Sequence, residues 1–495
     1  MKDSIIQLGI PMKRHLLLAV TNIVVSLAIL ASCGFAWPTV YPTGTTSYAP
    51  DKAFNCYTLF TPLIIKTEDA PSTLYLINMN GEVVHSWSVP FPALYGQLLP
   101  NGNLVVIGNH PDNSPGRPGV NAFAMGGAAG WLVELTWEGK RVFEHVDLNM
   151  HHDFVKLSNG NTIYLAWEPV PAALRKKVRG GLAKTEHKDG TMYNDVIIEI
   201  NPQKKVVWKW HANDHLNPDI DIIGPIYNRD EWLHTNSLAL LDNGNILLTN
   251  RSTDSVMIID KKSGKIVSRF GNAVYLDKKI GQIRQRKLPQ TLGGPHDAQQ
   301  IPAGYLGAGN ILVLDNGVYT HKTRALVFDP ATGKPVGQWP AGGQFGRPLF
   351  SYFLGSVQPL PNNNLFICDG ANGRFLQAPV SAGNEIVWEY VNPYTPTPQI
   401  NGCVFKAHLY GQDYCPQFRQ LPPAQGRAVD LPNATVDAMA HPAEEKSVET
   451  PPETSADSPA PSTPASGDTG KFLALLLTVS VLANAFLWQK LRRSR

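Results

Sequence analysis

The 495-residue sequence lacks the short motifs that hold nucleotides or structural metals. It has no GxxxxGK[ST] loop, no GxGxxG after a strand pattern and no CxxC pair. Phosphate loops and dinucleotide folds need those glycines for close backbone approach, and structural zinc needs paired thiolates, so none of these sites is supported. The formal net charge is only +3, with 43 Lys and Arg residues against 40 Asp and Glu residues. Nothing here indicates a nucleic-acid partner.

Helical periodicity is absent as well between Pro38 and Arg427. In its place a hairpin phrase recurs six times, as LYLINMNGEVVHSW, WLVELTWEGKRVFEH, VIIEINPQKKVVWKW, VMIIDKKSGKIVSRF, ALVFDPATGKPVGQW and FLQAPVSAGNEIVWEY. Each copy reads as a strand, a tight turn and a second strand that ends on an aromatic residue. The pattern predicts an all-β chain, and six hairpins with further strands between them predict a β-propeller of about six four-stranded blades. A β-sandwich is the structural alternative, which the regular hairpin spacing disfavours.

The two ends of the chain differ in kind from the repeats. Lys13 and Arg14 precede the apolar run His15–Trp37, and the apolar run Phe472–Trp488 is followed by a basic tail. Each run is long enough, or nearly so, to cross a hydrocarbon core. Because the basic residues lie on the sides away from the repeats, the positive-inside rule predicts a membrane-tethered protein with its propeller on the extracytoplasmic, periplasmic side.

These features divide the chain into four parts. We expect a cytoplasmic tail with a signal or anchor segment (1–37), a catalytic β-propeller (38–428), a disordered linker rich in Pro, Ser and Thr (429–470), and a C-terminal transmembrane helix with a basic tail (471–495). The ring is expected to close by pairing Ala53–Pro62 with Phe405–Leu421. The first apolar run has three interpretations: a retained anchor, a cleaved signal peptide, or a lipoprotein signal with Cys33 acylated. Retention or cleavage is favoured, because four-residue lipobox matches arise often in apolar runs.

Five cysteines in such a chain allow a disulfide. Cys403 and Cys415 are the predicted pair, because a short loop with little periodic structure separates them. Cys56 and Cys368 lie on predicted strands and are expected to be small buried hydrophobes.

A second repeated phrase carries histidine in only some copies. HDFVKLSNGNTIYLAW, HTNSLALLDNGNILLTNR and HDAQQIPAGYLGAGNILVLDNG contain it, whereas YGQLLPNGNLVVIGNH and LGSVQPLPNNNLFICDG have none before the turn. His152 and His296 occupy the same position, and His234 falls two residues earlier, which keeps the same face of an extended strand. The innermost strands of a propeller face its central channel, so we expect the three imidazoles to converge there. Arg251, just after the strand led by His234, is expected to reach the same funnel.

Converging imidazoles and a guanidinium suit an anionic, oxygen-rich group. Arginine holds such oxyanions through its fork, one neutral imidazole can act as nucleophile, and a second can move the leaving-group proton. The alternative is that these histidines have only a structural role in the core. We assign that role to the remaining histidines of the chain. His151 lies on the opposite face of the strand, and we expect it to have a packing or surface role. A metal-dependent hydrolase would use the same three histidines as ligands, although Arg251 would repel the cation. A non-catalytic binding propeller is the third possibility.

The motifs around these residues resemble those of the bacterial aryl sulfotransferase family. HHD before an NGN turn, WLHTNS before TNR, and GGPHDAQ carry the resemblance, which spans the region from Leu74 to Tyr390. It implies a six-bladed propeller outside the cytoplasm that moves a sulfuryl group from a phenolic sulfate ester to a phenol acceptor. The transfer would pass through a sulfohistidine and need neither a nucleotide donor nor another cofactor.

The resemblance also implies roles for single residues. His296 would be the nucleophile, while His234, His152 and Arg251 would bind the sulfuryl oxygens and handle the phenolic proton. Asn236, in the same motif as His234, would join Arg251 in binding substrate. Family members carry a separate N-terminal β-domain that helps form a dimer, whereas only a short segment precedes the first hairpin here, so the oligomeric state is left open.

Overall fold

The computed structural model describes residues 42–64, 70–113, 125–271, 292–340, 349–380, 385–394 and 402–430. The chain divides into two compact units, Met1–Thr435 and Val436–Arg495, and the second lies outside the described residues. Both apolar runs, Cys33 and nearly all of the predicted linker also lie outside them. Among the residues that are described, no helix is long and apolar enough to cross a membrane.

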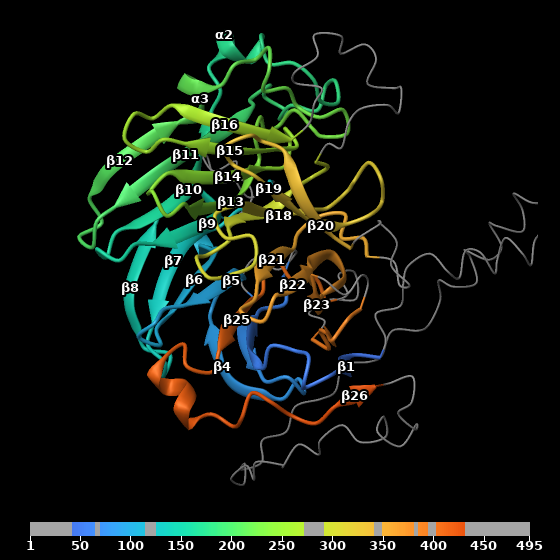
Figure 1. Ribbon diagram of the computed structural model, residues 1–495. Helices are drawn as coiled ribbons and strands as arrows, with labels where there is room; N and C mark the ends of the chain where they lie inside the picture. The colour runs from blue at the N-terminus through green and yellow to red at the C-terminus, as the bar shows by residue number, and fades with distance from the viewer. Residues whose placement is uncertain are drawn as a thin grey trace, which may run out of the picture. The chain divides into compact units, whose positions relative to one another are not determined.

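The described strands form six antiparallel sheets that follow one another as the blades of a propeller (Figure 1). The first three blades are β25(His408–Gly411), β2(Cys56–Phe60), β3(Ser72–Ile77) and β4(Val83–Val89); β5(Ala93–Leu98), β6(Leu104–Asn109), β7(Gly130–Leu135) and β8(Arg141–Val146); and β9(Met150–Lys156), β10(Thr162–Pro169), β11(Tyr193–Ile200) and β12(Val206–His211). The next two are β13(Thr235–Leu240), β14(Ile246–Asn250), β15(Ser255–Ile259) and β16(Ile266–Gly271); and β17(His296–Gln300), β18(Ile311–Asp315), β19(Arg324–Phe328) and β20(Pro335–Trp339).

The sixth sheet has six strands: β21(Ser356–Pro359), β22(Asn364–Asp369), β23(Arg374–Pro379), β24(Trp388–Val391), β1(Gly44–Tyr48) and β26(Val429–Asp430). The helical pieces among the described residues are short: α2(Ala172–Arg175), α3(Ala212–His215), η1(Pro111–Asn113), η6(Gly370–Asn372) and η7(Pro416–Gln420). The predicted all-β propeller of six blades is therefore confirmed.

The ring is closed by segments from both ends of the repeat region. β25 pairs with β2, with His408 opposite Leu59, as expected for the predicted pairing of these two regions. A second closure was not expected from the sequence. β1 pairs with β24 on one side and with β26 on the other, so Tyr48 lies opposite both Trp388 and Val429.

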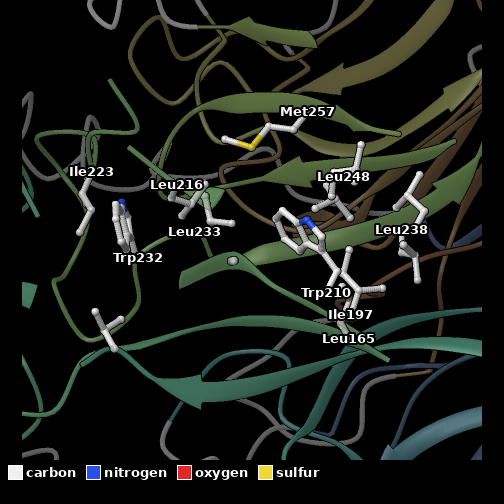
Figure 2. Close-up of a cluster of buried hydrophobic side chains, with 14 of the residues drawn as sticks. Leu165, Ile197, Trp210, Leu216, Ile223, Trp232, Leu233, Leu238, Leu248 and Met257 are labelled. Carbon is white, nitrogen blue, oxygen red and sulfur yellow. The ribbon is translucent and has the colours of Figure 1, made fainter. Parts of the chain in front are cut away.

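The cores lie between neighbouring blades. Between the third and fourth blades, Ile197 and Leu165 face Leu248 across the indole of Trp210 (Figure 2). Every residue of β15 is buried, because blades cover both faces of the strand. The period-two alternation seen in the sequence survives best in strands such as β16, at the outer edge of its blade. Full burial of one large aliphatic side chain contributes roughly 1.5–3 kcal/mol.

The predicted disulfide is wrong. Cys403 and Cys415 are both free and buried, and each packs in a different apolar cluster. The thiol of Cys403 donates to the carbonyl oxygen of Ala371 at 3.0 Å. Strand β25 lies between the two cysteines, so pairing within the sheet, rather than a disulfide, holds that segment in place. Cys56 and Cys368 are buried on strands, as predicted.

Candidate active site

The inner strands of three consecutive blades lose their register where the candidate residues stand. The pairing shifts at His152 and Asp153 in β9, at Asn236 in β13, and directly after His296 in β17. Such bulges bend a strand and re-aim its side chains. The backbone there is strained, with φ of 49° at His152 and 52° at His234, each costing roughly 1–2 kcal/mol for a residue with a side chain.

The histidines face one cavity of about 490 Å³. His152, His234, His296 and Arg251 all lie on its wall, so the structure brings together the four residues that the repeat register singled out. The cavity lining also includes apolar side chains, those of Leu63, Leu94, Met125, Phe353, Leu354 and Phe405. The cavity thus combines the polar histidine and arginine side chains with apolar surface large enough to contact an aromatic ring.

The hydrogen bonds of His296 fix its tautomer. Its Nδ1 lies 2.8 Å from Asn316 Oδ1 and 3.0 Å from the carbonyl oxygen of Gly294. The Asn316 amide nitrogen donates to two carbonyl oxygens, those of Ser351 and Leu354, so its oxygen must accept. Nδ1 therefore carries the proton, and Nε2 presents a lone pair. That lone pair accepts the backbone N–H of Leu354 at 3.2 Å.

His152 and His234 contact each other edge to face, with ring centroids 4.7 Å apart. Behind them His151 is fully buried and stacks on Trp167, so its expected packing role is confirmed. His151 Nδ1 lies 2.9 Å from His152 Nδ1. Its Nε2 lies 3.0 Å from Asp195 Oδ1, although these two atoms are not aligned as a hydrogen bond.

Gly127 closes the other edge of His152. A Cβ at this glycine would overlap the His152 ring, and its φ of 81° also disfavours a side chain. The imidazole is therefore enclosed between His151 on its Nδ1 side and the Gly127 backbone on its Nε2 side.

Glu231 is the functional residue that sequence analysis missed. Its Oε1 lies 2.9 Å from His234 Nδ1, and its Oε2 accepts the indole N–H of Trp167 at 2.9 Å. Burial, followed by the charge of Asp195, raises the pKa of Glu231 to about 8. The available signal was the motif EWLHTNS, in which an acid stands three residues before the histidine.

The electrostatics keep the imidazoles neutral. Burial first, and then the charge of Arg251, lower the pKa values of His296 and His234 to about 3. Burial, followed by the neighbouring histidines, holds the pKa of His152 well below its usual range. Arg251 places its guanidinium 4.9 Å from the centre of the Tyr227 ring, and among the described residues no carboxylate forms an ion pair with it. Neutral imidazoles therefore share the cavity with a guanidinium that has no ion-pair partner among the described residues, which suits an oxyanion.

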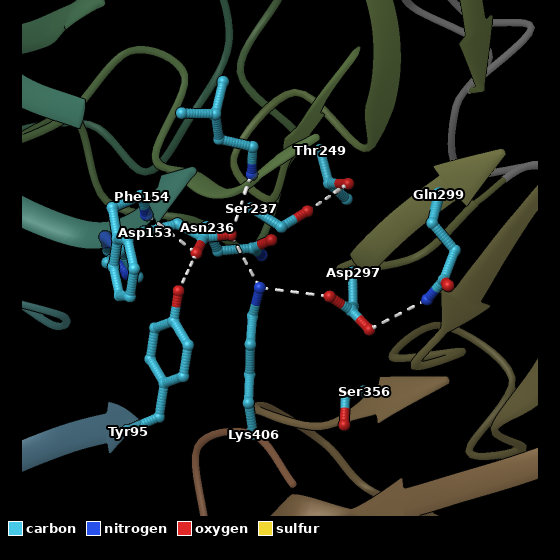
Figure 3. A network of polar contacts seen from close by, with 12 residues as sticks. Tyr95, Asp153, Phe154, Asn236, Ser237, Thr249, Asp297, Gln299, Ser356 and Lys406 are labelled. Atoms are coloured by element: carbon cyan, nitrogen blue, oxygen red, sulfur yellow. Dashed lines mark hydrogen bonds and ion pairs between the residues drawn. The ribbon is translucent and has the colours of Figure 1, made fainter. Parts of the chain in front are cut away.

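A buried ionic network involves the residues that directly follow two of the histidines in sequence (Figure 3). Lys406 points between two carboxylates, 2.6 Å from Asp153 Oδ2 and 3.0 Å from Asp297 Oδ1. These carboxylates also accept the backbone N–H groups of Leu238 and Val357 in the next blades. Since Asp153 follows His152 and Asp297 follows His296, the network joins the backbones that carry two of the three histidines.

Asn236 is not part of the cavity wall. It is fully buried, and its amide nitrogen donates to the carbonyl oxygen of Pro295 at 2.8 Å. The structure therefore places this residue, predicted to bind substrate, behind the wall, where it holds the segment that leads into His296.

The metal-site alternative finds no geometric support in the part of the chain that the structure describes. No group of three or more His, Cys, Asp or Glu side chains there is arranged to hold a metal ion. Arg251 also shares the cavity with the three histidines, and its positive charge disfavours a bound cation.

Comparison with known proteins agrees with the motifs. The family model described as Arylsulfotransferase (ASST) matches residues 67–395. A search of curated proteins found no match. Among solved structures, a protein of unknown function from Bacteroides caccae is similar at 14% identity, covering 71% of this chain and 98% of that one, with a TM-score of 0.43. Virginiamycin B lyase from Staphylococcus aureus is similar at 10% identity, covering 70% and 87%, with a TM-score of 0.36.

Proposed function

Because the chain belongs to the arylsulfotransferase family, we propose that it moves a sulfuryl group from an aryl sulfate to a phenolic acceptor through a sulfohistidine at His296. One observation carries the proposal. His296, whose Nε2 carries no proton, and Arg251 line the same cavity, and apolar side chains complete its lining. The cation and the imidazole suit the sulfate group, and the apolar side chains suit the aryl ring.

The first half-reaction forms a bond between His296 Nε2 and sulfur and breaks the bond from sulfur to the aryl oxygen. The proton on Nδ1 stays hydrogen-bonded to the oxygens of Asn316 and Gly294, and these hydrogen bonds stabilise the positive charge that develops on the ring. Arg251 holds sulfuryl oxygens through its fork. The N–H of Leu354, which bonds Nε2 in the resting protein, is released by the attack and can donate to a sulfuryl oxygen.

The leaving group fits an aromatic substrate. A phenol has a pKa of about 10, so an aryl oxide departs far more readily than an alkoxide. The acceptor reverses the step, because its oxygen attacks the same sulfur and restores the free imidazole. Transfer between phenols is therefore chemically balanced and needs no cofactor.

The position of Lys406 bears on how the first phenol leaves the histidine cavity and how the acceptor enters it. Lys406, Asp153 and Asp297 line a separate cavity of about 830 Å³, which shares no lining residue with the histidine cavity. We infer that the ionic network separates the two cavities. We infer that the first phenol leaves by the way it entered before the acceptor binds, which gives ping-pong kinetics.

Intact mass after incubation with 4-nitrophenyl sulfate tests the proposal. We expect one added sulfuryl group, located on His296 by peptide mapping and absent from the His296→Ala variant. Arg251→Lys keeps the charge but loses the fork, so its transfer rate should fall while the protein stays folded. His152→Ala and His234→Ala should slow transfer. Loss of activity on chelation, restored by zinc, would replace this mechanism with metal-dependent hydrolysis.

We propose further that the propeller lies outside the cytoplasm. The support is the pair of apolar runs, His15–Trp37 and Phe472–Trp488, with basic residues on the sides away from the propeller. A reporter active only in the cytoplasm should work when fused after Arg495 and fail when inserted within 431–470. The reverse pattern would contradict the topology.

A further inference from the structure

We propose that Glu231 stores the phenolic proton between the two half-reactions and passes it through the ring of His234. In this scheme His234 is the general acid and base that touches the substrate, and Glu231 is its positioning and proton-holding partner. The inference rests on the proposed sulfuryl transfer and deepens it.

The two oxygens of Glu231 have separate tasks. The indole N–H of Trp167 donates to Oε2, and this contact favours Oε2 as the carbonyl oxygen, the better acceptor, when the carboxyl group is protonated. The proton is then favoured on Oε1, which is 2.9 Å from the acceptor His234 Nδ1. The carboxyl group is aimed at one atom, and both side chains are largely buried.

This contact gives the pair two proton states. With Glu231 protonated, Oε1–H donates to Nδ1, and His234 carries its own proton on Nε2 toward the cavity. With Glu231 ionised, Nδ1–H donates to Oε1, and Nε2 presents a lone pair. The first state is a general acid and the second a general base, and they differ by one proton.

The surroundings favour the protonated state before substrate binds. Burial and the carboxylates of Asp195 and Asp230 raise the pKa of Glu231, against the opposing influence of His151 and of the Trp167 indole. Burial and the cation of Arg251 lower the pKa of His234. Both pKa shifts disfavour an ion pair between a Glu231 carboxylate and a His234 imidazolium, so before substrate binds the two side chains are a carboxylic acid and a neutral imidazole.

The chemistry balances over both steps. As His296 Nε2 bonds to sulfur, the departing aryl oxygen takes the proton from His234 Nε2, and Nδ1 takes the proton of Glu231. The phenol leaves neutral, and the negative charge that entered on the sulfate remains as the Glu231 carboxylate. The acceptor phenol then gives its proton to Nε2, Nδ1 returns a proton to Glu231, and the sulfur–nitrogen bond breaks.

His152 is less suited to this task. Its Nδ1 faces His151, and its Nε2 edge lies against the backbone of Gly127. His296 uses Nε2 as nucleophile. His234 is the remaining imidazole on the cavity wall, and no described residue forms a hydrogen bond to its Nε2.

Glu231→Gln tests the inference while preserving size and shape. Because Trp167 requires an acceptor, the introduced amide turns its nitrogen toward His234 Nδ1 and locks Nε2 in the protonated form. Proton transfer through the ring is then lost. We expect release of phenol from phenyl sulfate in a single turnover to fall by about 10²–10⁴-fold, the usual contribution of general acid catalysis. Release of 4-nitrophenol, a far better leaving group, should be nearly retained and also shows that the variant is folded.

A matched control is Glu168→Gln. Glu168 Oε2 pairs with His211 Nδ1 at 2.8 Å, outside the cavity, so both leaving groups should react as in the wild type. Equal losses for phenyl and 4-nitrophenyl sulfate in Glu231→Gln, or no loss for either, would overturn the proton-storing role. Wild-type protein that forms no sulfuryl adduct would instead overturn the proposed function itself.

Discussion

The side-chain oxygen of Asn316 lies 2.8 Å from His296 Nδ1, and this contact decides which ring nitrogen carries the proton. The same amide is anchored through its nitrogen to the carbonyl oxygens of Ser351 and Leu354, so it cannot rotate without losing three hydrogen bonds. Asn316 therefore ties His296 to the turn whose N–H donates to Nε2. On the proposed mechanism, a residue outside the cavity wall sets the tautomer of the proposed nucleophile.

Replacing Asn316 separates this orienting role from simple packing. Asn316→Ala removes the acceptor and should slow adduct formation by about 10–100-fold, comparable to losing a partner that orients a ligating or reacting histidine. Asn316→Asp keeps an acceptor but adds a negative charge beside Nδ1–H, which raises the pKa of His296. The acid limb of its pH–rate profile should then move to higher pH. An unshifted profile in Asn316→Asp would contradict the role of Nδ1.

Gly127→Ala probes the enclosure of His152. The added Cβ would overlap the His152 ring, so we expect both a lower free energy of unfolding and slower transfer. Gly139→Ala is the control, because its φ of 83° matches that of Gly127 while nothing lies within 4 Å of its added Cβ. Both variants carry the backbone strain, about 1 kcal/mol, and only Gly127→Ala should lose activity. Equal activity in the two variants would show that His152 need not hold its position.

Glu231 should leave a signature in the pH dependence of stability. Its pKa is raised in the folded protein from 4.5 to about 8, first by burial and then by Asp195. A carboxyl group that binds its proton more tightly when folded stabilises the protein at low pH, and this contribution declines as pH rises between those two values. The free energy of unfolding of Glu231→Gln minus that of wild type should therefore increase from pH 5 to 8, by at most about 1.4 kcal/mol per pH unit. Urea titrations at several pH values would measure it, and a constant difference would contradict the raised pKa.

The sequence was sufficient for the architecture and for part of the site. Hairpin phrases of regular period predicted the blades. His152, His234 and His296 were found because histidine occurs in only some copies of the second phrase, and because the register of a strand in a propeller determines the side to which each side chain points. The partners of these histidines were not predictable in this way. Asn316 lies in the sequence LDNG, at the end of a strand in its own blade, and Glu231 lies in the loop before the strand that follows His234. Their contacts therefore depend on the conformations of loops, which show no repeating sequence pattern.

The same distinction explains the wrong disulfide prediction and the unexpected position of Asn236. Cys403 and Cys415 looked like the ends of a loop because the four-residue strand β25 is too short to show alternation. Asn236 was assigned to substrate by its place in the motif, but the bulge at that residue turns it behind the wall, toward Pro295. A bulge adds one residue to a strand and reverses the face of the residues after it, which sequence register alone does not reveal.

Lys406 illustrates how much the site depends on charge buried below it. Removing the ammonium in Lys406→Met would leave Asp153 and Asp297 facing each other without a cation, and breaking such a buried pair costs about 3–5 kcal/mol. The triple variant Lys406→Met, Asp153→Asn, Asp297→Asn removes the charges together and should recover most of that stability. Lys261→Met breaks a pair in which the lysine side chain is 27% exposed and that of Glu199 is 7% exposed, and because solvent reaches this lysine its loss should cost less than the loss of Lys406. If Lys406→Met were as stable as Lys261→Met in urea unfolding, the buried ionic network would not contribute to stability as argued.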